Sequence, residues 1–365
     1  MYQLRGLIVA VVVVVAGTWG TVAECDALQP SLTDFDFSPK IVDVGPGPAS
    51  VTCTMTIEDD VSGVAEATCQ FISPSFVQSR SCTAEAPSSG DRLSGTFTCT
   101  AELPEHVEGG VWTVNNVTLL DRVGRNRTLS SFELQASGFP TELSVTSPQP
   151  DLTGPQVDAF DFTPKSVDVT VSGRDVTCTM DWSDAISGVQ FTQCSFTSPS
   201  GDQTQGCGAF EPSSGSPNDG TYECGFTVPR YAEDGTWRAT VFALDRVANS
   251  TPVDADGLSG QGFPTDLQVT SDSDVSPPSL DGFDLQPTSV DVSTTNDTVT
   301  CTMTLRDTLA GVQNATCEIG RLDGFSFLAH TCTAEVPSSG TRNDGVFRCD
   351  VVIPAYSPSG TWRVQ

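Results

Sequence analysis

The residues of this chain that could do chemistry are mainly cysteines and aspartates. Its 365 residues include 13 cysteines and 46 acidic residues, but only two histidines. With so few histidines, the chain has little of the usual material for general-base catalysis or a mixed cysteine and histidine metal site. The G-x-S-x-G, H-E-x-x-H and Walker sequences are also absent. We therefore expect a protein that is not an enzyme and that has no certain cofactor.

Apart from Cys25, the cysteines form three sets of four. The spacings within a set are 16, 13 and 17 residues in the first two sets and 16, 15 and 17 in the third. Self-similarity at a period of about 124 residues indicates a tandem array. We place the units at residues 26–150, 151–273 and 274–365. The sets are Cys53, Cys69, Cys82 and Cys99, then Cys178, Cys194, Cys207 and Cys224, then Cys301, Cys317, Cys332 and Cys349.

These cysteines could form disulfides, bind a metal or remain as buried thiols. Zinc is disfavoured because no C-x-x-C sequence occurs and histidine is scarce. Four cysteines allow three pairings. We predict that the first pairs with the fourth, on neighbouring strands, and that the second pairs with the third, across a hairpin. The predicted bridges are Cys53–Cys99, Cys69–Cys82, Cys178–Cys224, Cys194–Cys207, Cys301–Cys349 and Cys317–Cys332. Cys25 is left without a predicted role.

Strands must position these side chains, because the sequence around the cysteines alternates with a period of two. Val51, Cys53, Met55 and Ile57 alternate with threonines, which is typical of a half-buried strand. About seven such strands per unit, separated by turn residues, predict an antiparallel two-sheet sandwich and no amphipathic helix. We expect the closing strand of the first unit to begin near Phe132. The third unit lacks the equivalent of this strand, so we expect a fragment of a longer array.

Aspartates recur at three positions of the aligned units. One lies before the opening strand, one follows the first cysteine by six residues, and one follows the tryptophan strand. If the strands follow immunoglobulin order, all three lie at one end of the sandwich. They could together bind Ca²⁺, or each could cap its own loop in an Asx-turn, and both readings stay open. These positions are Asp26, Asp59 and Asp121, then Asp151, Asp184 and Asp245, then Asp274 and Asp307.

The N-terminus has the charged, apolar and small-residue regions of a secretory signal peptide, which we place at residues 1–24. A signal anchor is the alternative, because residues 6–23 carry no charge. Secretion would place the cysteines in an oxidising, extracellular compartment. No second apolar run occurs, so we expect no membrane span in the mature chain.

The charge of the chain excludes one class of partner. A formal net charge of −29 is incompatible with a basic phosphate-binding face, so no nucleic acid is expected. Five sequons predict N-glycosylation of a secreted protein. They lie at Asn116, Asn126, Asn249, Asn296 and Asn314.

The repeated motifs resemble those of tandem immunoglobulin-like repeats from bacterial and microbial-eukaryote surface proteins. Each unit carries Asp-x-x-x-Pro, an opening Phe-Asp strand and a Cys-Thr-Met strand, and Gly-Val near its second cysteine. The acidic junctions are also similar, more weakly, to those of cadherin repeats. The resemblance implies stalks or adhesive modules, whereas four cysteines per unit depart from the microbial pattern. Trp112, Trp237 and Trp362 recur in one frame and are expected in the core.

These observations favour an extracellular or cell-surface array that is structural or adhesive. Calcium would stiffen its junctions if the aspartates bind the ion rather than cap their own loops. Its partner would be a protein or glycan on a cell surface or matrix. The alternative is an accessory or carbohydrate-binding region of a larger secreted enzyme or receptor.

Overall fold

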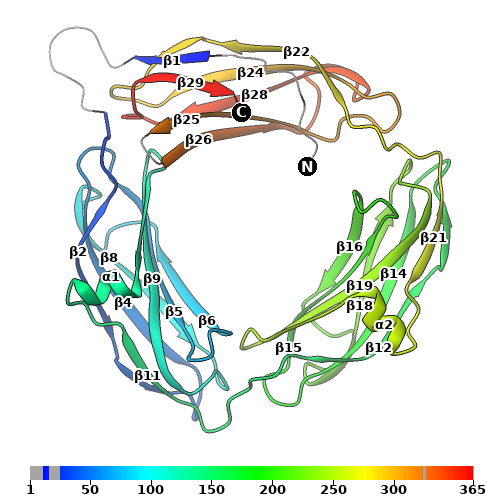
Figure 1. Ribbon diagram of the computed structural model, residues 1–365, viewed down its shortest axis with the longest axis horizontal. Coiled ribbons are helices and arrows are strands. Elements are labelled where there is room, and N and C mark those ends of the chain that lie inside the picture. The colour runs from blue at the N-terminus through cyan, green and yellow to red at the C-terminus, as the bar shows by residue number, and fades with distance from the viewer. Residues whose placement is uncertain (1–10, 16–24, 324–325, 365) are drawn as a thin grey trace.

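A computed structural model describes residues 11–15, 25–323 and 326–364. Figure 1 shows three β-sandwiches arranged as the three sides of a triangle. Each consists of a four-stranded sheet that faces a sheet of five or six strands. Neither described helix has the length and apolar character needed to cross a bilayer.

In the first sandwich, the four-stranded sheet has the order β2-β4-β8-β7. The facing sheet has the order β3-β11-β9-β5-β6, and β10 pairs with β9. All neighbours are antiparallel except β3 and β11, which are parallel. The strands are β2 (Ser31–Ser38), β3 (Ile41–Asp43), β4 (Ala49–Glu58), β5 (Val64–Ile72), β6 (Ser79–Ala84), β7 (Ser89–Gly90), β8 (Ser94–Leu103), β9 (Gly110–Asp121), β10 (Asn126–Ser130) and β11 (Glu142–Thr146).

The second sandwich repeats this topology strand for strand. The orders are β12-β14-β18-β17 and β13-β21-β19-β15-β16, with β20 on β19. Two antiparallel sheets in this order, with a parallel first and last strand, are an immunoglobulin-like arrangement. The fold class is therefore confirmed as all-β. The strands are β12 (Gln156–Thr163), β13 (Ser166–Asp168), β14 (Arg174–Ser183), β15 (Val189–Thr197), β16 (Thr204–Ala209), β17 (Ser214–Ser216), β18 (Asp219–Val228), β19 (Gly235–Asp245), β20 (Ser250–Val253) and β21 (Asp266–Thr270).

The third sandwich has the orders β22-β24-β28-β27 and β23-β1-β29-β25-β26. Its place for a closing strand is filled by β1, from the N-terminal valine run. β1 lies parallel to β23 and antiparallel to β29, as β11 lies between β3 and β9. The rest of the predicted signal peptide lies outside the described residues. The strands are β1 (Val11–Val15), β22 (Ser279–Gln286), β23 (Ser289–Asp291), β24 (Asp297–Arg306), β25 (Ala315–Asp323), β26 (Ser326–Ala334), β27 (Ser339–Gly340), β28 (Asp344–Ile353) and β29 (Gly360–Val364).

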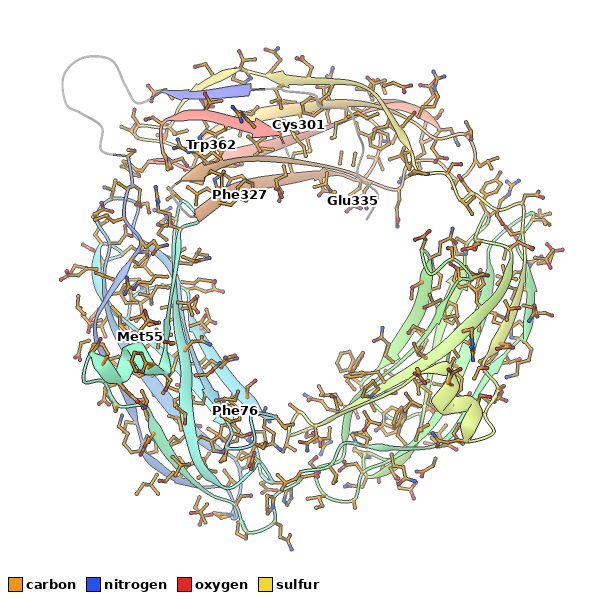
Figure 2. All side chains as sticks on the ribbon, viewed as in Figure 1. Met55, Phe76, Cys301, Phe327, Glu335 and Trp362 are labelled. Carbon is orange, nitrogen blue, oxygen red and sulfur yellow. A yellow bond between two sulfur atoms is a disulfide. The ribbon has the colours of Figure 1, made fainter. Side chains whose placement is uncertain are left out.

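The sandwich cores follow from the alternation in the sequence. Val51, Cys53, Met55 and Ile57 on β4 are all fully buried, because alternate side chains of a strand point to the same face. The three repeated tryptophans, Trp112, Trp237 and Trp362, are also fully buried, which confirms their predicted place in the core. Figure 2 shows Met55 and Trp362 inside their sandwiches. None of these tryptophans can therefore stack on a sugar at the surface.

The predicted disulfide pairing is wrong. Neighbouring strands were predicted correctly, since Cys53 lies opposite Cys99 and Cys69 lies opposite Cys82. The bonds, however, run between the two sheets, because inward-facing side chains meet those of the opposite sheet in the core. The corresponding errors at Cys178–Cys224, Cys194–Cys207, Cys301–Cys349 and Cys317–Cys332 have the same cause. The bridges are Cys53–Cys69, Cys82–Cys99, Cys178–Cys194, Cys207–Cys224, Cys301–Cys317 and Cys332–Cys349.

A short helix replaces the strand predicted near Phe132. α1 (Ser131–Ala136) begins after Ser130, whose side chain caps the helix together with Glu133 in a capping box. Leu134 is buried whereas Phe132 is 79% exposed. In the second sandwich, α2 (Ala255–Gly260) takes the same place, with Asp254 as its N-cap.

Candidate cation sites at the sandwich junctions

The structure brings Asp26, Asp59 and Asp121 together at one end of the first sandwich. Asp26 precedes β2, Asp59 follows β4, and Asp121 ends β9. One side-chain oxygen from each lies within 4.8 Å of the other two. All three residues are buried, with exposed fractions of 0%, 9% and 1%. The predicted convergence of chain entry and two loops therefore occurs.

Asp59 and Asp121 each use one carboxylate oxygen to shape the loop in which they lie. Oδ1 of Asp59 accepts from the backbone N–H groups of Gly63 at 2.6 Å and Val61 at 3.3 Å. Oδ1 of Asp121 accepts from those of Val123 at 3.0 Å and Arg125 at 2.8 Å. These are the Asx-turn bonds expected of aspartate beside glycine. The second oxygen, Oδ2, of each is buried without a hydrogen bond.

Asp26 connects these loops to the chain entry. Its Oδ2 accepts from the N–H of Ser62 at 3.1 Å, and its backbone carbonyl accepts from Nη2 of Arg125 at 2.9 Å. Its Oδ1 has no hydrogen bond, and Nε of Arg125 lies 3.8 Å from it. The buried guanidinium thus balances part of the charge of the three carboxylates.

Asp151, Asp184 and Asp245 form the equivalent cluster of the second sandwich, again with oxygens within 4.8 Å of one another. Asp151 Oδ2 accepts from the N–H of Ser187 at 3.0 Å, as Asp26 does from Ser62. Asn249 replaces the arginine of the first cluster, and its Nδ2 donates to Oδ2 of Asp245 at 2.7 Å. This cluster keeps three carboxylates without a cationic side chain in the equivalent position.

The third sandwich repeats two of the three positions. Oδ1 of Asp307 accepts from the N–H of Gly311 at 2.7 Å, and Oδ2 of Asp274 accepts from the N–H of Ala310 at 2.8 Å. Within residues 25–323 and 326–364, no third carboxylate completes this cluster. Asp274 and Asp307 therefore form a pair of loop-capping carboxylates.

Burial makes the full clusters electrostatically costly in the absence of a cation. Two unit charges 4.8 Å apart repel by about 3–4 kcal/mol at an effective dielectric constant of about 20. Burial raises the pKa of Asp26 to about 6 and that of Asp121 to about 7. It raises the pKa of Asp245 to about 6. The pKa values of Asp59 and Asp184 are raised for the same first cause.

In the absence of divalent cations, stability should fall between pH 5 and pH 7.5. The raised pKa values mean that the folded protein holds more protons than the unfolded chain in this range, so raising the pH favours unfolding. The unfolding midpoint in chelator should therefore decrease with pH, and the decrease should be smaller for Asp121→Asn. A midpoint that rises through this range in differential scanning fluorimetry would contradict the raised pKa values.

A repeated backbone hydrogen bond joins the sandwiches at the three corners of the triangle. At each corner, the N–H of the aspartate before the opening strand donates to a carbonyl of another sandwich. The three acceptor residues have φ values of 67–69°, in the left-handed region. The pairs are Asp151 with His106 at 2.7 Å, Asp274 with Tyr231 at 2.9 Å, and Asp26 with Tyr356 at 2.9 Å.

Sequence reasoning missed the residue that contributes most to the first junction. Gln78 is fully buried, and its Nε2 donates to the carbonyl of Asp151 at 2.8 Å and to Oδ1 of Asn249 at 3.1 Å. Val247, in the same loop as Asn249, is fully buried against the core of the first sandwich. Gln203 repeats the contact, with Nε2 3.2 Å from the carbonyl of Asp274. Both glutamines lie four residues before the third cysteine of a set, a recurrence that the sequence already contains.

The predicted glycosylation sites differ in accessibility. Asn249 is wrong as a site in the folded protein, because it is 4% exposed and its amide nitrogen is bonded to Asp245 and Asp151. Asn116 is half-buried, and its Nδ2 donates to Gln70. Three sites are exposed and stay predictions: Asn126, Asn296 and Asn314.

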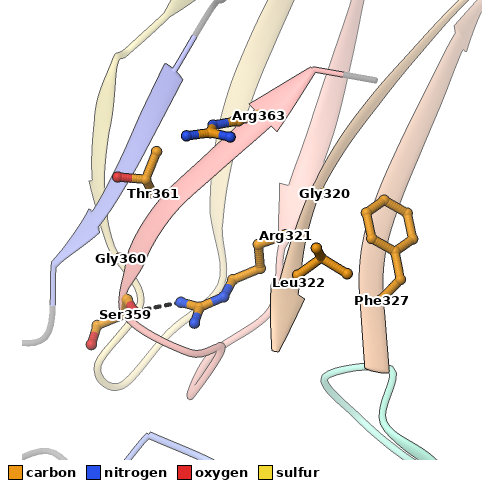
Figure 3. Close-up of a pocket in the computed structure, with 8 residues that line it drawn as sticks. All are labelled: Gly320, Arg321, Leu322, Phe327, Ser359, Gly360, Thr361 and Arg363. Atoms are coloured by element: carbon orange, nitrogen blue, oxygen red, sulfur yellow. Dashed lines mark hydrogen bonds between the residues drawn. The ribbon is translucent and has the colours of Figure 1, made fainter. Parts of the chain in front are cut away.

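A groove of about 430 Å³ lies on the third sandwich (Figure 3). Arg321 and Leu322 of β25, Phe327 of β26 and Arg363 of β29 line it. Nη1 of Arg321 donates to the carbonyl of Ser359, which fixes the guanidinium on the adjacent turn. The groove lining contains none of the aspartates of the junction clusters, so the groove is a separate feature.

Comparison with known proteins finds matches among solved structures. No protein family matches the chain, and no curated protein matches it. Solved structures do match, 66 chains in all. One is a crystal structure of an ICAM-5 D1–D4 ectodomain fragment, 14% identical, in an alignment that covers 87% of this chain and 76% of that chain with a TM-score of 0.18. A TM-score this low does not support any inference about the fold, arrangement or binding partners of this chain.

Proposed function

We propose that this chain is an extracellular array of immunoglobulin-like units that acts as a spacer or adhesive element at a cell surface or in a matrix. In this proposal the chain is not an enzyme, and it binds a protein or a glycan. Six disulfide bonds support an oxidising compartment, since such bonds persist there and are rare in the cytosol. The net charge of −29 supports solubility and disfavours a nucleic-acid partner.

The observation that carries this proposal is the repetition of one junction. A rigid spacer needs units whose relative orientation is fixed. Domains that are joined by a linker alone move relative to one another and do not have a fixed orientation. Here the same backbone bond recurs at each corner, and a glutamine side chain adds a second bond at two of them, from the buried Gln78 and the half-buried Gln203. Calcium, one of the two interpretations of the acidic positions, would act at these same junctions.

Small-angle X-ray scattering of the oxidised chain tests the proposal. We expect a curve that a single arrangement of the three sandwiches fits, because the buried junction bonds restrict their relative motion. A curve that requires an ensemble of freely jointed sandwiches would contradict a spacer with fixed junctions. Scattering in chelator and in calcium separates this question from that of cation binding.

A further inference from the structure

The first aspartate cluster has more buried oxygen than its loops need. Loop capping uses Oδ1 of Asp59 and Oδ1 of Asp121, and it leaves Oδ2 of both buried without a hydrogen bond. Oδ1 of Asp26 also lacks a hydrogen bond, and Nε of Arg125 lies 3.8 Å from it as an ion-pair partner. Buried polar atoms in folded proteins almost always have a partner, so the Oδ2 atoms of Asp59 and Asp121 indicate a missing one. The Asx-turn interpretation accounts for Oδ1 of Asp59 and of Asp121 and leaves the burial of Oδ2 of both residues unexplained.

The spacing of these oxygens suits one particular kind of partner. Ligands at 2.3–2.6 Å from a central ion lie on a sphere, so two of them can be at most about 4.6–5.2 Å apart. One carboxylate oxygen from each of the three aspartates lies within 4.8 Å of the other two, inside that limit. The hydroxyl of Ser62, beside Asp26, is also buried without a partner. A single ion between the carboxylates would satisfy the free oxygens and offset their mutual repulsion.

We propose that Asp26, Asp59 and Asp121 form a Ca²⁺ site that ties the chain entry to the two loops at the junction. The inference rests on the proposed function and names the ligand of its junction. An all-oxygen donor set without histidine or cysteine favours a hard cation over zinc. Water molecules would complete the coordination, because one oxygen of each carboxylate already accepts hydrogen bonds and the three that remain are fewer than the 6–8 that calcium takes. An ion bound to Asp26 would also restrain the third sandwich, since the N–H of Asp26 donates to the carbonyl of Tyr356 there.

Calcium should slow hydrogen exchange locally in the full oxidised chain. At a calcium concentration about 100-fold above Kd, exchange through cation-free openings should slow about 100-fold. The effect should be confined to amides held by the cluster, those of Val61, Gly63 and Val123 among them. Sodium chloride at matched ionic strength is the control, because the net charge of −29 makes any salt stabilising through screening. Equal slowing in sodium chloride would overturn the proposal.

Variants localise the ion. Asp121→Asn keeps an oxygen that can cap the loop and removes the charge, so it should abolish the calcium-dependent slowing in residues 59–63. Asp60→Asn changes an exposed neighbour outside the cluster and should leave the slowing intact. If Asp121→Asn fails to fold, calorimetric titration of the unmodified chain with CaCl₂ decides instead, and the absence of binding up to 10⁻³ M overturns the proposal. Scattering that fits fixed sandwiches without calcium would leave the spacer function standing while the ion is rejected.

Discussion

Trypsin digestion of the oxidised chain should release residues 41–80 as one peptide with an internal disulfide. Cleavage is expected after Lys40, Arg80 and Arg92, which separates Cys53 and Cys69 from the other two cysteines of the set. The structure bonds Cys53 to Cys69, so this peptide should be free, and peptide 81–92 should be linked to 93–122. Mass spectrometry before and after reduction reads the result. A peptide 41–80 that is cross-linked to both others would indicate the in-sheet pairing instead.

Removing this bridge should strongly destabilise the first sandwich. Replacement of Cys53 and Cys69 together by alanine is expected to lower the free energy of unfolding by about 3 kcal/mol, because a loop closed across 16 residues no longer restricts the unfolded chain. Loss of two buried sulfur atoms adds a packing cost. Exchange protection of β4 and β5 reports the change, and the second sandwich is the internal control. Unchanged protection in β4 would contradict a stabilising bridge between the sheets.

Replacing Gln78 by leucine should loosen the junction between the first two sandwiches. The change removes two donated bonds, to Asp151 and Asn249, and leaves the N–H of Glu108, which donates to Oε1 of Gln78 at 2.8 Å, without that acceptor. Each buried group left without a partner costs about 1–3 kcal/mol. We therefore expect that a single arrangement of the sandwiches no longer fits the small-angle scattering curve and that an ensemble is needed, while each sandwich keeps its own fold. Gln78→Leu is chosen because it retains most of the side-chain volume.

A matched substitution provides the control for this result. Gln156 lies exposed on β12 and makes no bond to another sandwich among the described residues, so Gln156→Leu should leave the scattering unchanged. The third unit already has leucine at the position of Gln78: Leu328 lies four residues before the third cysteine of its set and is buried. A leucine at this position is therefore compatible with the sandwich fold. Scattering that is the same for Gln78→Leu and the unmodified chain would show that the glutamine does not hold the junction.

Local patterns in the sequence were sufficient to predict the sandwiches and the convergence of the aspartates at one end of each of the first two. Alternation of period two identifies the inward residues, since a strand turns alternate side chains to one face. Alignment of the units then identifies Asp26, Asp59 and Asp121, because repeated loops at one end of a sandwich lie together. The helix α1 was missed although Ser130 and Glu133 carry the capping-box spacing, and alternation was extended past the point where it applies.

What lies between sheets and between sandwiches depends on tertiary structure. Cys53 faces Cys99 along its own sheet but bonds to Cys69, and only the packing of one sheet on the other decides between them. The burial of Asn249 and Gln78 depends likewise on how the second sandwich meets the first. A one-dimensional repeat records which face a residue occupies, since that follows from backbone geometry. It does not record the distance between two faces, since that is set by the side chains that fill the space between them.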